Sequence, residues 1–446
     1  MAGGEWTIQL IQTTPADLQL QVASNWVSEV KKELSEVSVV MSQSRPESIY
    51  RIPWSLKKLR RSAYQPQMVS MGPYHRGERQ LAAMEKHKKR AFLRLVERSE
   101  KPIDCYVDKL APEVENLMDS YDQLDGSWKE DSKAFLKMMM IDGCFILELM
   151  RSATAKPDVL REMGYDEGND PVFSNHGKLY FTPYLRRDML MLENQLPLRL
   201  LKIILAVEEA LPKPEQLTEL ILKFVGRWEP SRNIQGFENC CHILDMYRKS
   251  LLLETEDRLP CRKEEDAYIR SATELTEAGI RFEKSKTINL NDISFRGGVL
   301  KLPRITVDDT LESEYLNLMA FERFHVDAGN EVTAYVFFMD RLIDSAKDVS
   351  LLHWRGILQN SLGSDKAVAK LFNSLSTDAC LDHSSSLGIV HRDVAVYCRS
   401  PLPSWIAYAK HNYFTNPWVG LSILAAIFLF ALTGVQTLYS VLAYYK

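Results

Sequence analysis

The chain lacks the short motifs that mark common enzyme and metal sites. It has no HExxH, no DxDxDG and no Walker loop, so no catalytic residue, cofactor-binding residue or metal ligand is predicted. Its seven cysteines are scattered and form no CxxC pair, which is typical of buried thiols in a reducing compartment and not of a disulfide framework. No asparagine lies in an N-x-Ser/Thr sequence, which agrees with a body that is not exposed to glycosylation. The net charge of −4 gives no general attraction to nucleic acid or to an anionic membrane.

Charge is also absent from the C-terminal end of the sequence. No Asp, Glu, Lys, Arg or His occurs from Asn412 to Tyr445. A bilayer core requires about 20 apolar residues of helix, so we expect a transmembrane helix that contacts lipid along residues 417–443. Trp418 and Tyr439 lie toward its two ends, as in the aromatic belts of membrane proteins. A buried core helix and the hydrophobic tail of a lipid-anchor signal are the alternatives.

The N-terminus offers no secretion signal. Residues 1–21 have no basic region followed by an apolar stretch. A single C-terminal span without such a signal is inserted after translation, which predicts a body that faces the cytosol. Lys410, Arg399 and Arg392 lie on the body side of the span, in agreement with the positive-inside rule. The expected location is a membrane crossed once, either the plasma membrane or an endomembrane.

The body is expected to be mainly α-helical, a multi-helix globular body with one small sheet. Apolar residues recur with helical spacing, and the nearly continuous apolar run 133–150 predicts a fully buried helix. Expected helices cover 81–98, 133–150, 184–209 with a break at Pro197, 217–224, 241–253, 272–278, 311–325, 332–346 and 364–375, the last capped by Ser364. Over about 280–307 the period changes to two, which predicts a small antiparallel β-sheet of three strands with a turn at Gly297-Gly298.

These patterns divide the chain into three regions. Residues 1–44 form an N-terminal region whose apolar positions, from Val22 through Trp26 to Val37, lie on one stripe of an amphipathic helix. Residues 45–411 form the single α-rich body. Residues 412–446 form the C-terminal anchor.

Several segments together carry a resemblance to a known family. In chain order they are IYRIPWSLKKLRRSAYQPQMVSMGPYHRG (49–77), LAAMEKHKKRAFL (81–93), MMMIDGCFILELM (138–150), DMLMLENQLPLRLL (188–201), SATELTEAGIRF (271–282), LNLMAFERF (316–324) and DRLIDSAKDVSLLHWRGILQNSLGSDKAVAKLFNSL (340–375). The chain resembles the plant family called domain of unknown function 247. The resemblance implies a membrane-associated plant protein of mostly unknown biochemistry. Some grass members lie at self-incompatibility loci and are regarded as pollen-side recognition determinants.

Four carboxylates stand out because they lie in the most hydrophobic segments: Asp142, Glu148, Asp188 and Glu193. Carboxylates in such places could bind a metal or act as an acid–base pair. Alternatively, each pairs with a nearby arginine such as Arg186, Arg187 or Arg199, or caps a buried helix end. The amides of LENQLP (192–197) either satisfy backbone groups freed by the proline or line a binding pocket.

Three further features each have a purely structural and a functional interpretation. The turn GPYHRG (72–77) either packs Tyr74 or presents His75 as a general base. The basic clusters 57–61 and 86–90 are either solvated faces or contacts for phosphates, with lipid head groups favoured over nucleic acid. In the tail helix, Gln436 either pairs with another helix or lies near the far interface.

The sequence therefore favours a tail-anchored plant protein that acts as a protein–protein interaction or recognition module, in signalling or in recognition of the self-incompatibility type. Expected partners are the lipid bilayer along residues 417–443, a protein that the sequence does not identify, and a second copy in a homo-oligomer. No cofactor and no nucleic acid are expected. One alternative is a membrane-bound enzyme that uses Asp142, Glu148, Asp188 and Glu193. The other is a cell-surface recognition protein with an extracellular body.

Overall fold

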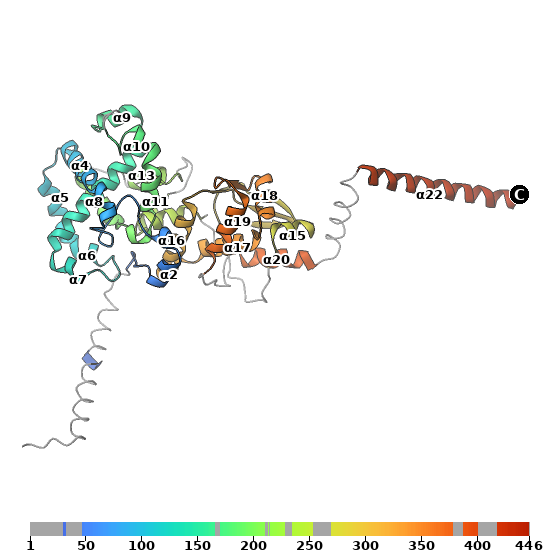
Figure 1. Ribbon diagram of the computed structural model, residues 1–446, viewed down its shortest axis with the longest axis horizontal. Helices are drawn as coiled ribbons and strands as arrows, with labels where there is room; N and C mark the ends of the chain where they lie inside the picture. The colour runs from blue at the N-terminus through green and yellow to red at the C-terminus, as the bar shows by residue number, and fades with distance from the viewer. Residues whose placement is uncertain are drawn as a thin grey trace, which may run out of the picture. The chain divides into compact units, whose positions relative to one another are not determined.

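The structure of the chain is a computed structural model, and it describes residues 30–32, 47–165, 170–209, 213, 215–227, 234–252, 269–377, 387–399 and 417–445. The chain divides into two compact units, residues 1–47 and residues 48–446. In the first unit residues 30–32 are helical, and most of the predicted amphipathic stripe lies outside the described residues. The second unit contains the helical body and the C-terminal helix (Figure 1).

The first half of the body is built around helix α8 (Ser132–Thr154). Its sequence is apolar on nearly every side, and most of its residues from Phe135 to Ser152 are buried, as the sequence predicts. The side chain of Asp131 caps α8 by accepting a hydrogen bond from the backbone N–H of Ala134. The helices that pack most extensively against α8 are α4 (Ala82–Ser99), α12 (Leu198–Glu208) and α13 (Gln216–Phe224).

The remaining helices of this half are short. They are α2 (Trp54–Leu59), α3 (Arg61–Tyr64), α5 (Ile103–Leu110), α6 (Val114–Met118), α7 (Gly126–Glu130), α9 (Pro157–Glu162), α10 (Asn175–Tyr180) and α11 (Thr182–Met189). Short 3₁₀ helices occur at η1 (Arg79–Leu81), η2 (Ala111–Glu113), η3 (Leu192–Asn194), η4 (Phe237–Asn239) and η5 (Val326–Ala328). The predicted break near Pro197 is confirmed, because α11 ends before η3 and α12 begins directly after the proline.

Helix α16 (Leu311–Phe324) connects the two halves of the body. It packs against α3 from the first half and against α14 (Ile243–Ser250), α17 (Glu331–Leu342) and α19 (Asp365–Leu375). The second half also contains α15 (Ala272–Glu277), α18 (Ala346–Trp354) and α20 (Gly388–Arg399). The predicted cap of α19 is confirmed, since the Ser364 side chain accepts a hydrogen bond from the N–H of Ala367. The predicted helix 332–346 ends early because a capping box of Ser345 and Asp348 starts α18.

The predicted three-stranded sheet is confirmed, although one of its two pairings is parallel. It contains β1 (Arg281–Lys284), β2 (Ser294–Arg296) and β3 (Val299–Leu302) in the order β1-β3-β2. The β2–β3 pair is antiparallel, and its turn is Gly297-Gly298, where both residues have positive φ. The β1–β3 pair is parallel. After β1 the chain crosses over to form β2 on the other side of the position that β3 takes, and β3 then returns between them in the same direction as β1.

A fourth strand leaves this sheet. The expected last strand is divided by Pro303, which has no N–H for a ladder hydrogen bond. The residues beyond it form β4 (Ile305–Val307), which pairs in parallel with β5 (Leu358–Asn360) in a separate two-stranded sheet. The prediction that 280–307 forms one sheet is therefore wrong for its last three residues.

The C-terminal helix α22 (Pro417–Tyr444) has 28 residues, a length of about 42 Å at 1.5 Å per residue. Its segment Leu421–Tyr444 is long and apolar enough to cross a membrane, and none of that segment is buried in protein. Among the described residues it is the one helix that meets this test. The prediction of a single C-terminal helix of membrane-spanning length and composition is confirmed.

Candidate functional site

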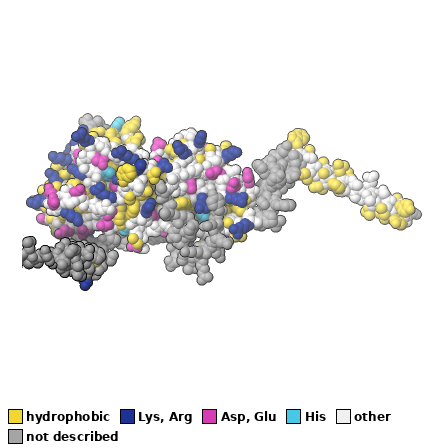
Figure 2. All heavy atoms as spheres, turned by 60° about the horizontal axis from the view of Figure 1, so that its bottom comes forward, with side chains coloured by type: hydrophobic (Ala, Val, Ile, Leu, Met, Phe, Trp, Pro, Cys, Tyr) yellow, Lys and Arg dark blue, Asp and Glu magenta, His cyan; other side chains and the backbone are white. Residues whose placement is uncertain are grey.

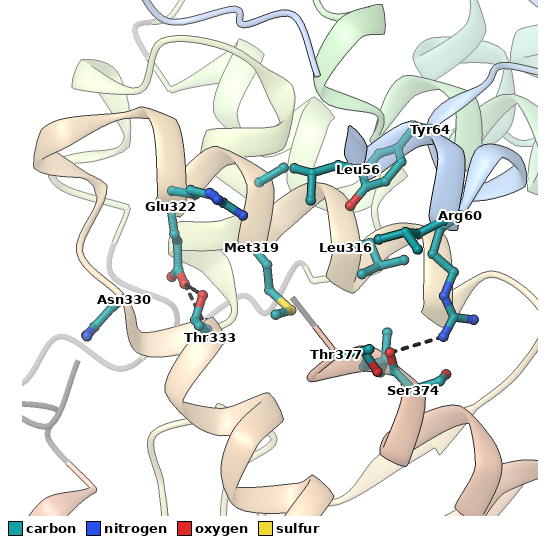
Figure 3. Close-up of a pocket in the computed structure, with 14 residues that line it drawn as sticks. Leu56, Arg60, Tyr64, Leu316, Met319, Glu322, Asn330, Thr333, Ser374 and Thr377 are labelled. Carbon is teal, nitrogen blue, oxygen red and sulfur yellow. Dashed lines mark hydrogen bonds between the residues drawn. The ribbon is translucent and has the colours of Figure 1, made fainter. Parts of the chain in front are cut away.

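An open groove lies on the body between four helical segments that are far apart in the sequence. Helices α2 and α3, α16, the start of α17 and the end of α19 contribute its walls, and its volume is about 380 Å³ (Figure 3). The apolar part of its lining consists of Leu56, Leu59, Tyr64, Leu316, Met319, Ala320 and Leu375. The polar part consists of Arg60, Glu322, Arg323, Asn330, Thr333, Ser374 and Thr377.

Helix α16 supplies the apolar floor of the groove. Leu316, Met319, Ala320 and Arg323 follow the spacing i, i+3, i+4, i+7 and therefore share one face of the helix. Met319 points into the middle of the groove in Figure 3. Because Leu316, Met319 and Ala320 are apolar and Arg323 is an exposed arginine, the floor is apolar in the centre and charged at one end.

Buried amide and hydroxyl groups fix α3 against α16. The Asn317 side chain donates a hydrogen bond of 2.9 Å to the carbonyl oxygen of Ala63, and the Ser313 hydroxyl donates one of 2.8 Å to the same atom. The Asn317 amide oxygen also accepts from the N–H of Leu192 at 2.9 Å. Since these groups are buried, losing one partner would cost more than an exposed hydrogen bond contributes. The wall formed by α3 is thus held in one position.

Arg60 closes one end of the groove. Its guanidinium donates to Glu312 at 2.7 Å and to the carbonyl oxygen of Ser374 at 3.1 Å, joining α2 to α16 and α19 (Figure 3). The Arg60 and Glu312 side chains are about one third exposed, so this ion pair contributes only about 0–1 kcal/mol. Its effect is mainly to orient the wall.

Glu322 lies at the other end, where four donors hold its carboxylate. They are the guanidinium of Arg248 at 2.8 Å, the N–H groups of Val332 and Thr333 at 3.0 and 2.8 Å, and the Thr333 hydroxyl at 2.6 Å. Burial raises the pKa of Glu322, while Arg248 and the other donors oppose that rise. The carboxylate therefore caps the start of α17 and joins it to α16. It is not a free general base.

The carboxylates named by the sequence lie outside the groove, and each has its own donors. Asp188 accepts hydrogen bonds from the N–H groups of Gln67 at 3.0 Å, Met68 at 2.6 Å and Val69 at 3.1 Å. Burial raises the pKa of Asp188, although these donors favour its charged form. Of the arginines named by the sequence, Arg187 lies 3.5 Å from this carboxylate. The other two are engaged elsewhere, Arg186 over the Phe224 ring and Arg199 with Glu113.

Glu193 connects three parts of the N-terminal segment. It accepts from the N–H of Ile52 at 2.7 Å and from Lys57 at 2.5 Å, and it lies 3.2 Å from the Nε2 atom of His75. Burial opposes ionisation of Glu193, but His75, Lys57 and the N–H of Ile52 outweigh it and lower the pKa of the carboxyl.

The amides of LENQLP satisfy backbone groups around the proline, which was one of the two interpretations of this segment. The Asn194 side chain accepts from the N–H of Met71 at 2.6 Å and donates to the carbonyl oxygen of Val69 at 3.0 Å. The Gln195 side chain donates to the carbonyl oxygens of Met189 and Met191 and accepts from the N–H of Leu244. The bonds of Asn194 hold residues 69–71 against the body. Residues 54–64, which form one wall of the groove, come just before them in the chain.

Asp142 and Lys88 form an ion pair with no solvent exposure, at 2.6 Å. Asp142 also accepts from the N–H of Gly72 at 3.0 Å, and Lys88 lies 2.8 Å from Glu85. Burial raises the pKa of Asp142 in spite of Lys88. The basic cluster 86–90 is therefore not a single solvated face, because its central lysine is in the core and Arg90 pairs with Asp170 at 2.6 Å.

Glu148 belongs to a separate buried network. Arg98 binds it with two hydrogen bonds of 2.9 and 2.5 Å, and the Tyr165 hydroxyl donates to it at 2.9 Å. Arg98 also contacts Glu208 at 3.2 Å. The four predicted carboxylates are thus bound by different donors. No group of three or more His, Cys, Asp or Glu side chains placed to hold a metal ion occurs in the described part of the chain.

The turn GPYHRG packs its tyrosine, as one of its two interpretations expected. The Tyr74 hydroxyl donates to the carbonyl oxygens of Ile49, at 3.1 Å, and Asp122, and its ring meets that of Tyr121 edge-on at 5.5 Å. The Nδ1 atom of His75 contacts Glu78 at 2.7 Å. This histidine is 6% exposed and lies outside the groove, so it has no access to a substrate bound there.

Sequence reasoning missed the groove entirely. Its lining comes from residues 56–64, 316–323, 330–333 and 374–377, and no motif connects these segments. The one local signal is on α16, where the sequence LNLMAFER (316–323) keeps an apolar face that ends in a charge. That pattern equally fits an ordinary core helix.

Comparisons with known proteins give consistent relatives. The model of the family DUF247, described as "Plant protein of unknown function", matches residues 49–432. The chain is 28% identical over 431 residues to UPF0481 protein At3g47200 of Arabidopsis thaliana, an alignment that covers 89% of this chain and 86% of that protein. It is 22% identical over 522 residues to a second UPF0481 protein of Arabidopsis thaliana, At3g02645, covering 93% of this chain and 94% of that protein. No solved structure matches the chain.

Proposed function

The chain belongs to the DUF247 family of plant proteins, and from that premise we propose that it is a membrane-anchored protein whose helical body binds another protein through the groove. The proposal has two parts. Helix α22 fixes the chain in a membrane with the body in the cytosol, and the groove receives apolar side chains of a partner protein.

The anchoring part rests on the length and composition of α22. The helix is about 42 Å long, which exceeds the ~30 Å hydrocarbon core of a bilayer. Its large apolar side chains are exposed, among them Leu424, Phe428 and Phe430. In water these side chains would be solvated at a cost of about 25 cal/mol per Å² of apolar surface. A bilayer removes that cost.

The binding part rests on one observation: an apolar groove at the surface whose walls are held in place. Burying one leucine-sized side chain contributes about 1.5–3 kcal/mol, and about 380 Å³ accommodates a few of them. The hydroxyl and amide groups of Asn330, Ser374 and Thr377 can hydrogen-bond a backbone laid across the rim. Because Arg60 and Glu322 already have ion-pair partners, the groove offers contacts and no free acid–base pair.

A catalytic role for Asp142, Glu148, Asp188 or Glu193 receives less support. Each carboxylate is at most 2% exposed and is engaged by several donors. Their arrangement supports the fold, because removing any of them would take the acceptor from hydrogen-bond donors that are buried or partly buried.

Site-directed photo-crosslinking tests the binding part. A photoreactive amino acid replaces Asn330, at the rim of the groove, in the full chain expressed in plant membranes. A discrete crosslinked protein is expected. Its yield should fall at least about tenfold when Leu59→Glu places a charge in the α2 wall of the groove, since a charge that the partner buries unpaired costs several kcal/mol.

The matched control is Leu93→Glu on α4. Leu93 and Leu59 are exposed to similar extents, 53% and 57%, and Leu93 does not line the groove. A crosslink that survives Leu59→Glu, or that Leu93→Glu removes equally, would rule out binding through the groove.

We also propose that two copies associate through α22. Ser422, Ala426, Thr433, Gln436 and Ser440 fall at spacings of four, seven, three and four, so these small or polar residues share one face of the helix. The hydroxyls of Ser422 and Thr433 bond carbonyl oxygens of their own helix. A glutamine amide within hydrocarbon is stabilised by a partner across a helix interface, and two copies in one membrane bring Gln436 to the same depth.

A further inference from the structure

Residues 48–77 contain six Lys or Arg and no Asp or Glu. Carboxylates from elsewhere in the chain neutralise part of this charge: Lys57 pairs with Glu193 at 2.5 Å and Arg60 with Glu312 at 2.7 Å. The structure thus separates the cations of cluster 57–61 into two kinds. Lys57 and Arg60 are paired with carboxylates of the body, whereas Lys58 and Arg61 are exposed.

The exposed cations lie beside exposed apolar side chains. No residue of α2 is buried, and Trp54 and Leu59 are 72% and 57% exposed. The Lys58 ammonium lies 5.2 Å from the centre of the Trp54 ring. Helix α2 lies on the lower side of the body in Figure 1, and Figure 2, which turns that side forward, shows hydrophobic side chains in the middle of the body with Lys and Arg around them.

We propose that Trp54, Lys58 and Arg61, called here the α2 surface, contact the anionic head groups of the membrane that α22 crosses. Tryptophan prefers the lipid–water interface, where its ring contacts the apolar layer and its N–H reaches the hydrated head-group region. Lysine and arginine close to an anionic leaflet are attracted to it, with an effect of about fivefold in affinity for each cation. The α2 surface combines both features and contains no carboxylate.

The second basic cluster serves as an internal comparison. In 86–90, Lys88 is buried against Asp142 and Arg90 pairs with Asp170, so that cluster has lost much of its available charge. A nucleic-acid site would require a more extended basic stripe with several phosphate contacts. The α2 surface is compact and carries an exposed indole, which fits a lipid interface.

This inference rests on the proposed membrane anchor. A six-residue helix buries too little to hold a protein on a bilayer by itself, because stable binding takes more than one signal. Pro417 follows Arg399 by 18 positions, which at ~3.3 Å per residue limits the reach between the two to about 60 Å. Such a tether keeps the α2 surface at high local concentration near the lipid, so a weak contact is populated.

The test uses the full chain reconstituted into phosphatidylcholine vesicles with and without roughly 30% phosphatidylserine. Amide hydrogen exchange of residues 54–62 is expected to be at least about fivefold slower on the anionic vesicles than on the neutral ones. The Lys58→Glu/Arg61→Glu variant should lose this difference. The Lys133→Glu/Lys137→Glu variant, which changes two exposed lysines of α8 and the net charge by the same amount, should retain it.

Equal exchange on the two kinds of vesicle, with the chain still resistant to alkaline extraction, would overturn the inference and leave the anchor intact. Slowing by a single-stranded RNA oligomer on neutral vesicles, without an effect of phosphatidylserine, would also overturn it in favour of nucleic acid. Loss of the chain from both vesicles on alkaline extraction would instead refute the anchor on which the inference rests.

Discussion

His242 makes the stability of the body depend on pH. The side chain has no solvent exposure, and its ring meets that of Phe321 edge-on at 4.9 Å. Its Nε2–H donates to the carbonyl oxygen of Ser48 at 2.9 Å, and its Nδ1 accepts from the N–H of Asp245 at 3.1 Å, which caps α14. Both ring nitrogens are thus used by one neutral tautomer. A proton on Nδ1 would face the N–H of Asp245.

Burial therefore lowers the pKa of His242 from 6.5 to about 4. The unfolded chain takes up the proton near pH 6.5, whereas the folded chain resists it down to about pH 4. The contribution of this group to stability is present above pH 6.5 and is lost as the pH falls toward 4. At about 1.4 kcal/mol for each pKa unit, the loss amounts to about 3 kcal/mol.

The variant His242→Asn separates this effect from other titrations. Asparagine supplies a side-chain oxygen for the cap, but it does not titrate and cannot reach the carbonyl oxygen of Ser48. At neutral pH the variant should be less stable by about 1–2 kcal/mol, for one lost buried hydrogen bond. Between about pH 7 and pH 4.5 the difference between the two proteins should shift by about 2–2.5 kcal/mol in favour of the variant.

Urea unfolding of both full-length proteins in detergent, followed by tryptophan fluorescence across this pH range, measures the difference directly. Wild type and variant share every other titrating group, so only the lost histidine changes their gap. If the two stability curves stay parallel, His242 ionises equally in the folded and unfolded states, and the argument from its two hydrogen bonds is refuted.

Other substitutions probe the buried pair, the turn and the tail helix. Lys88→Met should lower the free energy of unfolding by about 3–5 kcal/mol, because it leaves Asp142 without its cation. The double variant Lys88→Met/Asp142→Leu should recover much of that loss. If Lys88→Met alone stays within ~1 kcal/mol of wild type in urea unfolding, the two residues are not coupled. Gly72→Ala should cost about 1–3 kcal/mol, because φ is +70° and a Cβ would lie 2.8 Å from a tyrosine hydroxyl. Gly77→Ala, where φ is +87° and no atom lies within 4 Å, should cost less in the same assay; equal losses would remove the steric part of the argument. Gln436→Leu should reduce chemically crosslinked dimers in native membranes, and unchanged dimer yield would exclude this amide from the interface.

The long helices of the body could be predicted because local pattern decides them. The all-round apolar sequence of α8 leaves no solvated face, and Pro197 cannot continue a helix that would need its N–H. The short helices from α5 to α7 and helix α18 were missed. Their apolar positions are few, and caps such as that of Ser345 and Asp348 are visible only once the neighbouring turn is known.

Strand pairing could not be read from the sequence in the same way. Alternation of apolar and polar residues identifies strands but not their partners. Ile305–Val307 alternates as well as its neighbours, yet it pairs with Leu358–Asn360 because Pro303 interrupts the first ladder. The direction of β1 relative to β3 likewise depends on how the chain crosses, which no local pattern contains.

The candidate carboxylates show the same limit. Their burial followed from the apolar sequence around them, but their partners did not. Asp188 and Glu193 are bound largely by residues 52–75, more than a hundred positions earlier in the chain. The groove is the extreme case, since each of its four segments reads as ordinary helix or helix end until the fold brings them together.

Protease protection of the tagged full-length protein in sealed microsomes, combined with alkaline extraction, tests the central claim most directly. The claim predicts that the chain stays with the membrane at high pH and that protease digests the body without detergent, leaving only a fragment that contains α22. A body that is protected until detergent is added would contradict the proposed topology and favour recognition at the cell surface. Release of the intact chain at high pH would contradict the anchor itself.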